Sequence, residues 1–329
     1  MVASLPFRTK VFAFLERFAN KSIADASVDE IPARRAARAK LLSSPVGRLI
    51  SGRTHPGVRI EDRWVDLEHE VIDDLATEGS PVRTRLRIYR PSARTNGPLP
   101  VVLLFHGGGW VLGNPEQNEW WASHTAARTP SVVVSVDYRL APEHPYPAAV
   151  LDCWAAFRWV LAHAAELGGD PSRVVVAGDS AGGNLAAVVA DVAGRSGGPL
   201  PVGQVLIYPA TEMEEEFPSE RQFANAPVLT SRGMRRSCAF IWPAPIRMRR
   251  PRLRCAARSP VPQYRPSSRL RGTTRCATTP FDTPKHCGPR AATSRRSTIP
   301  TPCTAISACP ASRHPRHGHS TRRSPSYGG

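Results

Sequence analysis

One serine of the chain lies in a setting that suits covalent catalysis. Ser180 is the third residue of the run Gly178-Asp179-Ser180-Ala181-Gly182-Gly183-Asn184. An apolar run at 174–176 precedes this motif and an alanine- and valine-rich run at 185–190 follows it. A G-x-S-x-G sequence placed between a strand and a helix is typical of a nucleophile elbow, whereas the same pattern in a loop is common by chance. The context therefore predicts that Ser180 is a nucleophile on a sharp turn.

The residues around Ser180 have types that such a turn requires. Gly178 and Gly182 leave room, because side chains at these positions would collide with the neighbouring strand and helix. Ala181 opens the following helix, so its backbone N–H is predicted to face the negative charge that develops during acyl transfer. The partial positive charge of the helix N-terminus adds to this effect. We expect Asp179 to support the adjacent loop.

A second motif, His106-Gly107-Gly108-Gly109-Trp110, directly follows the apolar run at 101–105. Acyl transfer passes through a tetrahedral intermediate with a charged oxygen, and each backbone N–H that binds this oxygen contributes on the order of 3 kcal/mol. Gly107 and Gly108 are predicted to supply such donors, with His106 and Gly109 supporting the loop. A glycine loop alone could also be a simple turn or a phosphate-binding loop, but the missing Lys-Ser/Thr pair and the missing G-x-G-x-x-G pattern argue against nucleotide binding.

These two motifs, together with Asp137-Tyr138-Arg139-Leu140-Ala141-Pro142-Glu143 between them, resemble the hormone-sensitive-lipase-like esterases in order and spacing. The resemblance covers about residues 60–235. It implies an α/β-hydrolase fold and the hydrolysis of short- to medium-chain acyl esters without a cofactor or metal. It also implies Ser180 as nucleophile and Gly107, Gly108 and Ala181 as oxyanion donors. The segment 137–143 is interpreted as a scaffold that forms ion pairs beneath the site.

The general base and its orienting acid are missing from this pattern. In α/β-hydrolases both follow the serine, acid first and histidine second. The family's Asp-Pro-Leu and His-Gly-Phe motifs should fall within 236–329, and neither is present. Asp282 has no preceding apolar run, and the histidines of this segment (His286, His314, His317 and His319) stand among arginines and prolines. We therefore expect weak or absent esterase activity.

A reading-frame change is one explanation for residues 236–329. Plausible codons for 271–279, read one base out of step, can spell Asp-Pro-Leu, and those for 300–305 can spell Val-His-Gly. The hidden Asp overlaps Thr273 and Thr274, and the hidden His overlaps Cys303 and Thr304. This hypothesis places the frame change near residues 235–245. Sequencing the coding DNA tests it, because stop codons in the alternative frame would refute it.

Charge divides the chain in the same place. Residues 236–329 contain 19 basic residues and one acidic residue, which leaves 25 basic and 26 acidic residues in 1–235. Six of the seven cysteines and 14 of the 33 prolines also fall in 236–329. Such a composition buries too little apolar surface to offset chain entropy, so we expect this tail to be disordered. The predicted domains are N-terminal cap helices (1–60), a hydrolase core (61–235) and the tail (236–329).

Within the core, the predicted elements alternate between strands and helices. Residues 7–41 have helical spacing, and 64–73 with 82–90 read as an antiparallel hairpin. Four short apolar runs read as strands, at 99–105, 131–136, 173–178 and 202–208, with helices near 117–128, 147–166 and 183–195 between them. This alternation predicts a mostly parallel sheet that is buried on both faces. Without further units after it, the strand at 202–208 would form an exposed edge.

Two other classes of function compete with ester hydrolysis. A catalytically silent protein that binds a small ligand would keep the pocket without the triad. The basic tail could bind nucleic acid, but only nonspecifically, since it has few aromatics and no recognised motif. A zinc site is weaker still, because the tail has no C-x₂-C pair. We predict neither a membrane span nor a signal peptide and expect a cytoplasmic location; no feature specifies an oligomeric state.

Overall fold

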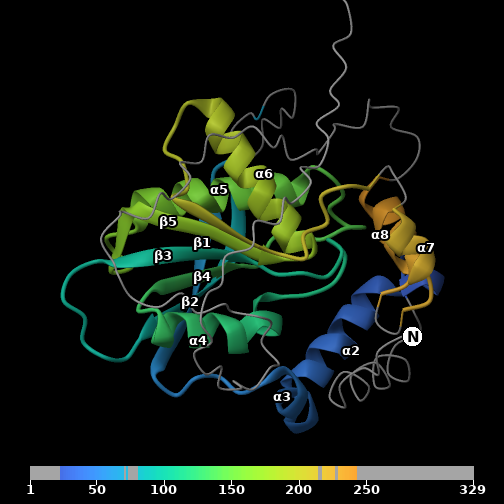
Figure 1. Ribbon diagram of the computed structural model, residues 1–329, viewed down its shortest axis with the longest axis horizontal. Coiled ribbons are helices and arrows are strands. Elements are labelled where there is room, and N and C mark those ends of the chain that lie inside the picture. Colours follow the sequence, from blue (N-terminus) through green and yellow to red (C-terminus); the bar gives the residue numbers. More distant parts are fainter. Residues whose placement is uncertain (1–22, 70–71, 73–80, 214–216, 227–228, 243–329) are drawn as a thin grey trace, which may run out of the picture. The chain divides into compact units, whose positions relative to one another are not determined.

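The computed structural model describes residues 23–69, 72, 81–213, 217–226 and 229–242, all within one compact unit (Figure 1). The strands among these residues are β1 (Val58–Leu67), β2 (Val82–Pro91), β3 (Leu99–Phe105), β4 (Val132–Val136), β5 (Gly169–Asp179) and β6 (Gly203–Ile207). The helices are η1 (Ile23–Asp25), α2 (Ile31–Ser43), α3 (Pro45–Ser51), η2 (Pro115–Asn118), α4 (Glu119–Arg128), α5 (Ala148–His163), α6 (Ala181–Ser196), α7 (Pro218–Gln222) and α8 (Ser231–Ile241).

The described strands form one mostly parallel sheet in the order β1-β2-β4-β3-β5-β6. β1 and β2 form the predicted antiparallel hairpin, although β1 begins at Val58, before the expected start at 64. β2 joins β4 in the antiparallel sense, and β3, β4, β5 and β6 run parallel to one another. Phe105 pairs with both Val136 and Gly178. The residues that follow β3, β4 and β5 therefore emerge together at one edge of the sheet.

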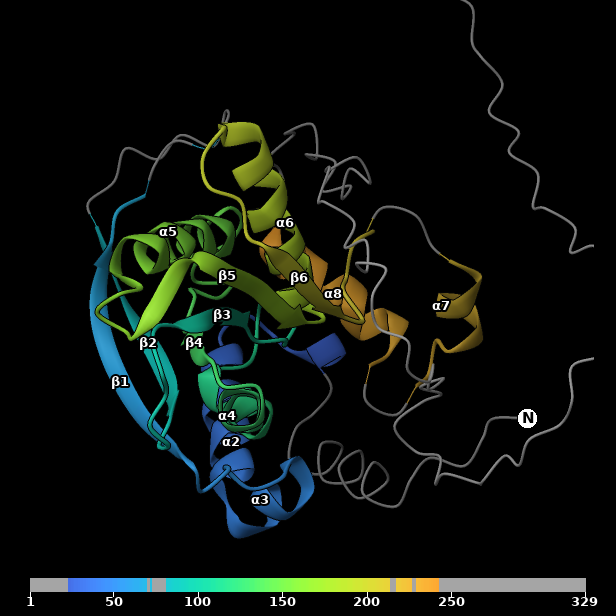
Figure 2. The same ribbon diagram turned by 60° about the vertical axis from the view of Figure 1, so that its left-hand side comes forward.

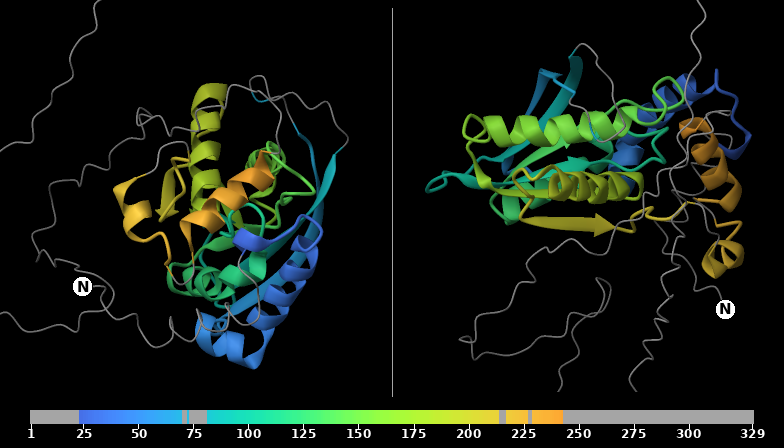
Figure 3. Two further views of the ribbon diagram at one scale, coloured as in Figure 1. Left: turned by 90° about the vertical axis from the view of Figure 1, so that its right-hand side faces the viewer. Right: turned by 90° about the horizontal axis from the view of Figure 1, so that it is seen from above.

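Helices cover both faces of the sheet, as the continuous apolar strands predicted. α5 and α6 lie side by side over one face, and α4 lies on the other (Figures 1 and 2; Figure 3, right). Alternate side chains of a strand point to opposite faces. Accordingly Val132, Val134 and Val136 of β4 join the core under α5 and α6, whereas Val133 joins a smaller cluster with Ala122 of α4. The predicted fold class is confirmed.

The N-terminal helical region differs from its prediction. The single helix expected over 7–41 starts outside the described residues, and within them α2 begins only at Ile31. The turn before α2 is closed by a hydrogen bond from the Ser27 N–H to Glu30 Oε2 (3.1 Å). Pro32 in the first turn of α2 lacks an N–H, which suits a helix start but not a helix interior. Ser44 then ends α2 and caps α3, accepting the Gly47 N–H at 3.0 Å.

At the other end of the described residues, the predicted core boundary at residue 235 falls inside α8. Phe240 and Ile241 of this helix are buried and belong to the main hydrophobic core. Helix α8 is thus part of the packed structure up to its end. Among the described strands, β6 pairs on one side only, with β5, and Val205 on it is 44 % exposed. The predicted tail from residue 243 onward lies outside the described residues.

Candidate active site

Ser180 lies on the sharp turn between β5 and α6. Its backbone has φ 53° and ψ −116°, a positive φ that is strained for a residue with a side chain. Two backbone hydrogen bonds to β6 and the residues that follow it hold this conformation. The Ser180 N–H donates to the Ile207 carbonyl (2.9 Å), and the Ser180 carbonyl accepts the Ala210 N–H (3.2 Å). The Asn184 N–H also donates to that carbonyl, at 3.0 Å, as the first bond of α6. The helix begins at Ala181, directly after the serine, as the elbow motif predicted; the apolar run alone had placed its start near 183.

The glycines that flank Ser180 are required by close backbone contacts. A Cβ atom on Gly178 would lie 2.3 Å from the carbonyl carbon and oxygen of Gly182. A Cβ atom on Gly182 would lie 2.0 Å from the Phe105 carbonyl oxygen. Both distances are far shorter than real Cβ contacts, and the obstructing atoms are backbone. The turn therefore presses against the start of α6 and the end of β3, which agrees with the steric reason predicted for these glycines.

The glycine loop after β3 lies against this turn through Asp179. The Gly107 N–H donates to Asp179 Oδ1 at 2.9 Å, and Asn118 Nδ2 donates to the same oxygen at 2.7 Å. Because a carboxylate already occupies the Gly107 N–H, this contact contradicts the predicted use of Gly107 as an oxyanion donor. Among the described residues, the N–H groups of Gly108, Gly109 and Ala181 have no hydrogen-bond partner. Gly109, which was predicted only to support the loop, thus carries one of the three unengaged donors.

The His106 side chain is buried within the loop. Its Nδ1 lies 2.8 Å from the Gly107 carbonyl oxygen, and its ring stacks on Tyr138 at a centroid distance of 4.3 Å. The Tyr138 hydroxyl donates in turn to the His106 carbonyl at 2.6 Å. Burial lowers the pKa of His106 to about 4, so the imidazole is neutral at pH 7 and donates one N–H. These contacts suit the loop-supporting role predicted for it.

Ion pairs surround the segment 137–143, as predicted for a scaffold. Asp137 contacts Arg85 at 3.0 Å, Arg139 contacts Asp152 at 2.8 Å, and Glu143 contacts Arg35 at 2.8 Å. Burial raises the pKa of Asp137, despite the nearby Arg85. For Asp152 burial acts in the same direction, but hydrogen bonds from His69 and Arg139 hold its pKa below the ordinary value.

Arg35 links helix α2 to the glycine loop. Its Nε donates to the Val111 carbonyl at 2.6 Å, and its Nη2 donates to the Ala141 carbonyl. Val111 donates in turn to the Gly108 carbonyl at 3.2 Å. The N-terminal helical region therefore contacts the glycine loop. Its role as a cap stays a prediction.

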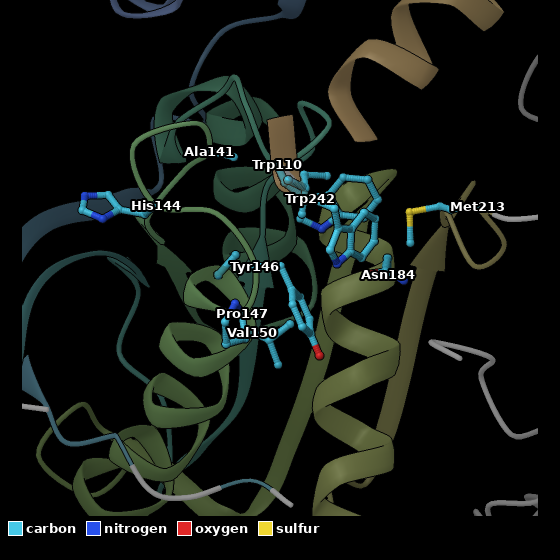
Figure 4. Close-up of a pocket in the computed structure, with 11 residues that line it drawn as sticks. Trp110, Ala141, His144, Tyr146, Pro147, Val150, Asn184, Met213 and Trp242 are labelled. Atoms are coloured by element: carbon cyan, nitrogen blue, oxygen red, sulfur yellow. The ribbon is translucent and has the colours of Figure 1, made fainter. Parts of the chain in front are cut away.

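A pocket opens beside the glycine loop, with an empty volume of about 360 Å³ that includes space open to solvent. Trp110, Trp242, Met213 and Asn184 gather at the N-terminal end of α6, whereas the His144 ring points away from them (Figure 4). Asn184 is one helical turn after Ser180, and Trp110 directly follows the glycines. The pocket thus borders both motifs, and most of the side chains that line it are apolar.

No described residue supplies a base to Ser180. The side chain of this serine has no hydrogen bond within the described ranges, and each described histidine lies elsewhere. His106 contacts Gly107, His69 contacts Asp152, and His163 contacts the Trp159 carbonyl. The remaining three are His55 and His124, which pack together, and His144 of the pocket. The tail candidates named above, from Asp282 to His319, lie outside the described residues, as do the Thr273/Thr274 and Cys303/Thr304 positions of the frame-change hypothesis.

Other kinds of site are absent from the described part of the chain. It contains no group of three or more His, Cys, Asp or Glu side chains arranged to hold a metal ion. None of the helices in the same ranges is long and apolar enough to cross a membrane. The basic tail and its cysteines, on which the nucleic-acid and zinc hypotheses depend, lie beyond residue 242.

Comparisons with known proteins agree with this geometry. A family described as the alpha/beta hydrolase fold matches residues 102–270. The chain is 50 % identical over 174 residues to the carboxylesterase NlhH of Mycobacterium tuberculosis, which covers 53 % of this chain and 51 % of that protein. It is 39 % identical over 147 residues to the hormone-sensitive lipase of Ictidomys tridecemlineatus, covering 45 % and 19 % of the two chains. The chain spans about half the length of NlhH.

A solved structure gives the same result over a larger share of the chain. The ester-hydrolase EH1AB1 from the metagenome of Lake Arreo, complexed with a derivative of bipyridine phosphonate, is 31 % identical, with a TM-score of 0.63. The match covers 76 % of this chain and 75 % of that one. The chain therefore belongs to the alpha/beta hydrolase fold family, within the group of esterases similar to hormone-sensitive lipase.

Proposed function

We propose that this protein is a carboxylic-ester hydrolase in which Ser180 is the nucleophile. One observation carries the proposal: Ser180 stands on a strained turn, and this turn and the glycine loop bound to it through Asp179 carry three backbone N–H groups that have no partner among the described residues. These N–H groups belong to Gly108, Gly109 and Ala181. Unengaged N–H groups beside a nucleophile are suited to bind an oxyanion. The similarity to carboxylesterases supports the same reaction.

In this reaction the Ser180 Oγ attacks the ester carbonyl carbon, and the π electron pair of the carbonyl moves to its oxygen. The three N–H groups bind this oxyanion, and the N-terminus of α6 adds partial positive charge. Collapse of the intermediate breaks the bond to the alcohol, which leaves with a proton and gives an acyl-serine. Water then attacks the acyl-serine, which releases the carboxylic acid and restores Ser180.

We also propose that turnover by this chain is slow. A general base must take the serine proton. None of the described residues provides one, and the family's Asp-Pro-Leu and His-Gly-Phe motifs are absent from 236–329. Serine hydrolases without a working triad retain roughly 10³–10⁴-fold acceleration over water from the oxyanion hole and binding alone. A low rate that still depends on Ser180 is therefore expected.

The proposed substrates are uncharged esters with short or medium acyl chains. The apolar walls of the pocket beside the glycine loop suit an acyl group of this kind. Hydrolysis of p-nitrophenyl butyrate by the full chain and by Ser180→Ala tests the function. We expect slow hydrolysis by the full chain and only background hydrolysis by the variant. Equal rates for the two proteins would refute Ser180 as the nucleophile.

A silent ligand-binding protein is the second candidate, and the unassisted Ser180 beside a formed pocket favours it. Calorimetric titration with the non-hydrolysable amide N-butylbutanamide separates the two functions. Binding of this amide together with no Ser180-dependent turnover of the ester would identify a binding protein. A cytoplasmic location is likewise proposed and is tested by cell fractionation.

A further inference from the structure

Two carbonyl groups of the glycine loop, those of Gly107 and Gly108, are each held by two hydrogen bonds. The Gly107 carbonyl accepts hydrogen bonds from His106 Nδ1 (2.8 Å) and Gln117 Nε2 (3.2 Å). The Gly108 carbonyl accepts the N–H groups of Val111 (3.2 Å) and Leu112 (2.8 Å). In a planar trans peptide the C=O and the next residue's N–H point in opposite directions. These contacts therefore fix the directions of the Gly108 and Gly109 N–H groups, each of which points away from the held carbonyl and is unengaged among the described residues.

The short helix η2 contacts both motifs of the site through two consecutive side chains. Gln117 holds the Gly107 carbonyl, which sets the direction of the Gly108 N–H. Asn118 donates to Asp179 Oδ1 at 2.7 Å, and the same oxygen accepts the Gly107 N–H at 2.9 Å. Since Asp179 is the residue before Ser180, η2 bridges the glycine loop and the nucleophile turn.

Helix η2 is itself firmly anchored. Asn114 precedes it, and the Asn114 side chain accepts the Gln117 N–H at 3.2 Å. Glu116 forms a two-pronged ion pair with Arg85 of β2, at 2.6 and 2.9 Å. Burial opposes the charged form of Glu116, but the hydrogen bond from Arg85 prevails and holds its pKa below the ordinary value. A helix fixed in this way can hold its own two amide side chains, those of Gln117 and Asn118, in place.

We propose that Gln117 and Asn118 are positioning residues for ester hydrolysis, which orient the oxyanion donors through Gly107 and Asp179. Neither residue needs to touch the substrate. Gln117 acts on the Gly108 N–H through the Gly107 peptide, and Asn118 acts on the turn before Ser180 through the Asp179 carboxylate. This inference rests on the proposed function, because the donors matter for chemistry only if an oxyanion forms.

Asn118→Asp is the sharpest variant, since it keeps the shape of the side chain. The new carboxylate cannot donate to Asp179 and repels it. The double variant Asn118→Asp with Asp179→Asn restores one donor and removes the repulsion between carboxylates. Gln117→Glu places an oxygen against the Gly107 carbonyl. Asn96→Asp and Gln222→Glu make the same chemical changes on exposed residues and serve as controls.

The readout is the rate at which an alkyl fluorophosphonate modifies Ser180, with imidazole in the buffer. The Ser180 Oγ forms a bond to phosphorus, the P–F bond breaks, fluoride leaves, and imidazole takes the serine proton. The charged phosphoryl oxygen of this reaction needs the same donors as an ester. We expect Asn118→Asp to lower the maximal rate about 10²-fold and Gln117→Glu about tenfold, with half-saturating concentrations and control rates within about twofold of wild type.

The double variant should regain about tenfold of the rate lost in Asn118→Asp. Modification of Asn118→Asp and Gln117→Glu at the wild-type maximal rate, or a change confined to the half-saturating concentration, would overturn the positioning role. Thermal melting of each variant checks that it folds, and Asn118→Ala replaces Asn118→Asp if the latter does not.

Hydrogen exchange of the peptide 106–112, followed by mass spectrometry, separates this inference from the proposed function. If η2 positions the loop, this peptide exchanges faster in Asn118→Asp than in wild type, while the exposed controls leave it unchanged. If this peptide exchanges faster in Asn118→Asp but Ser180 is never modified in any protein, the hydrolase function is refuted and the positioning of the loop by η2 is kept. If exchange of the peptide is unchanged in Asn118→Asp, the positioning of the loop by η2 is overturned, whatever the reactivity of Ser180.

Discussion

Ester hydrolysis at Ser180 needs oxyanion donors on one side of the serine and a general base on the other, and the described residues differ in what they offer on these two sides. On the donor side, Gly108, Gly109 and Ala181 present unengaged N–H groups, and the loop that carries them is fixed by hydrogen bonds. On the base side, the Ser180 side chain contacts no histidine among the described residues. All three N–H groups of the proposed donor side thus belong to described residues, whereas no described residue is proposed as the base.

This difference follows from the order of the elements along the chain. The donor side needs only the residues that leave β3 and β5, and the register of Phe105 with Gly178 brings these together at one edge of the sheet. The base and acid of an α/β-hydrolase follow later strands. A chain folded through β6 and α8 can thus form an oxyanion site without forming a triad. This difference can be tested by supplying a base from solution or by destabilising the residues that hold the donors.

Supplying a base from solution should have the largest effect. We expect imidazole at about 0.5 M to raise the Ser180-dependent hydrolysis of p-nitrophenyl butyrate by about 10²-fold, since general-base assistance contributes typically 10²–10⁴-fold. Ser180→Ala measures the hydrolysis that imidazole causes alone, which is subtracted. Rapid turnover without imidazole that Ser180→Ala abolishes would show that residues outside the described ranges supply a base.

The turn at Ser180 depends on close backbone packing, so Gly182→Ala should destabilise the fold. The added Cβ would lie 2.0 Å from the Phe105 carbonyl oxygen, which cannot move without shifting β3. We expect a loss of about 3 kcal/mol in the free energy of unfolding, measured by urea denaturation. Gly203→Ala is the matched control, because its Cβ would make an ordinary contact at 3.8 Å with Val175. Equal stabilities of the two variants would contradict the packing described here.

Acid should weaken the donor side through His106. Burial lowers its pKa to about 4, against 6.5 for an exposed histidine, so between these pH values the unfolded chain binds a proton that the folded chain does not. Stability from this source is complete above pH 6.5 and is lost as the pH falls toward 4. We expect a loss of about 2 kcal/mol at pH 5 relative to pH 8. His106→Asn, followed by urea unfolding across this range, should lose about 2 kcal/mol less than wild type, and parallel profiles would refute the buried neutral histidine.

The smallest effect is expected at Arg85, which anchors η2 and acts on the glycine loop only through that helix. Arg85→Lys keeps the charge beside Glu116 and Asp137 but loses the two-pronged contact with Glu116. We expect a cost of about 1 kcal/mol in the free energy of unfolding, because the pair is only partly buried. Arg59→Lys, on an exposed part of β1, should change stability by less than half of that. A larger cost in Arg59→Lys than in Arg85→Lys would contradict the anchoring of η2.

Much of the fold could be predicted from the sequence because the parallel strands β3, β4, β5 and β6 contain short apolar runs. The prediction at 99–105 coincides with β3, and the elbow motif placed Ser180 between a strand and a helix. Periodicity alone failed at the N-terminus, where one helix was predicted over 7–41 although α2 begins only at Ile31, with Pro32 in its first turn. Local pattern thus predicts an element well where one residue type dominates it.

The finer parts of the site could not be predicted in this way. Gly107 was expected to bind the oxyanion, but the direction of its N–H is decided by Asp179, 72 residues later in the chain. Gln117 and Asn118 were not predicted as site residues, because their role depends on contacts between a four-residue helix and two separate motifs. No spacing of residues encodes such contacts, which depend on how β3 and β5 place their ends.

Mapping the residue modified by a fluorophosphonate is the most direct test of the central claim. The full chain is incubated with the probe and imidazole, and the adduct is located by mass spectrometry of proteolytic peptides. A nucleophile beside a formed oxyanion site should give a single adduct on Ser180, with none on the Ser180→Ala chain. Absence of an adduct on Ser180, or equal modification of other serines, would contradict the account.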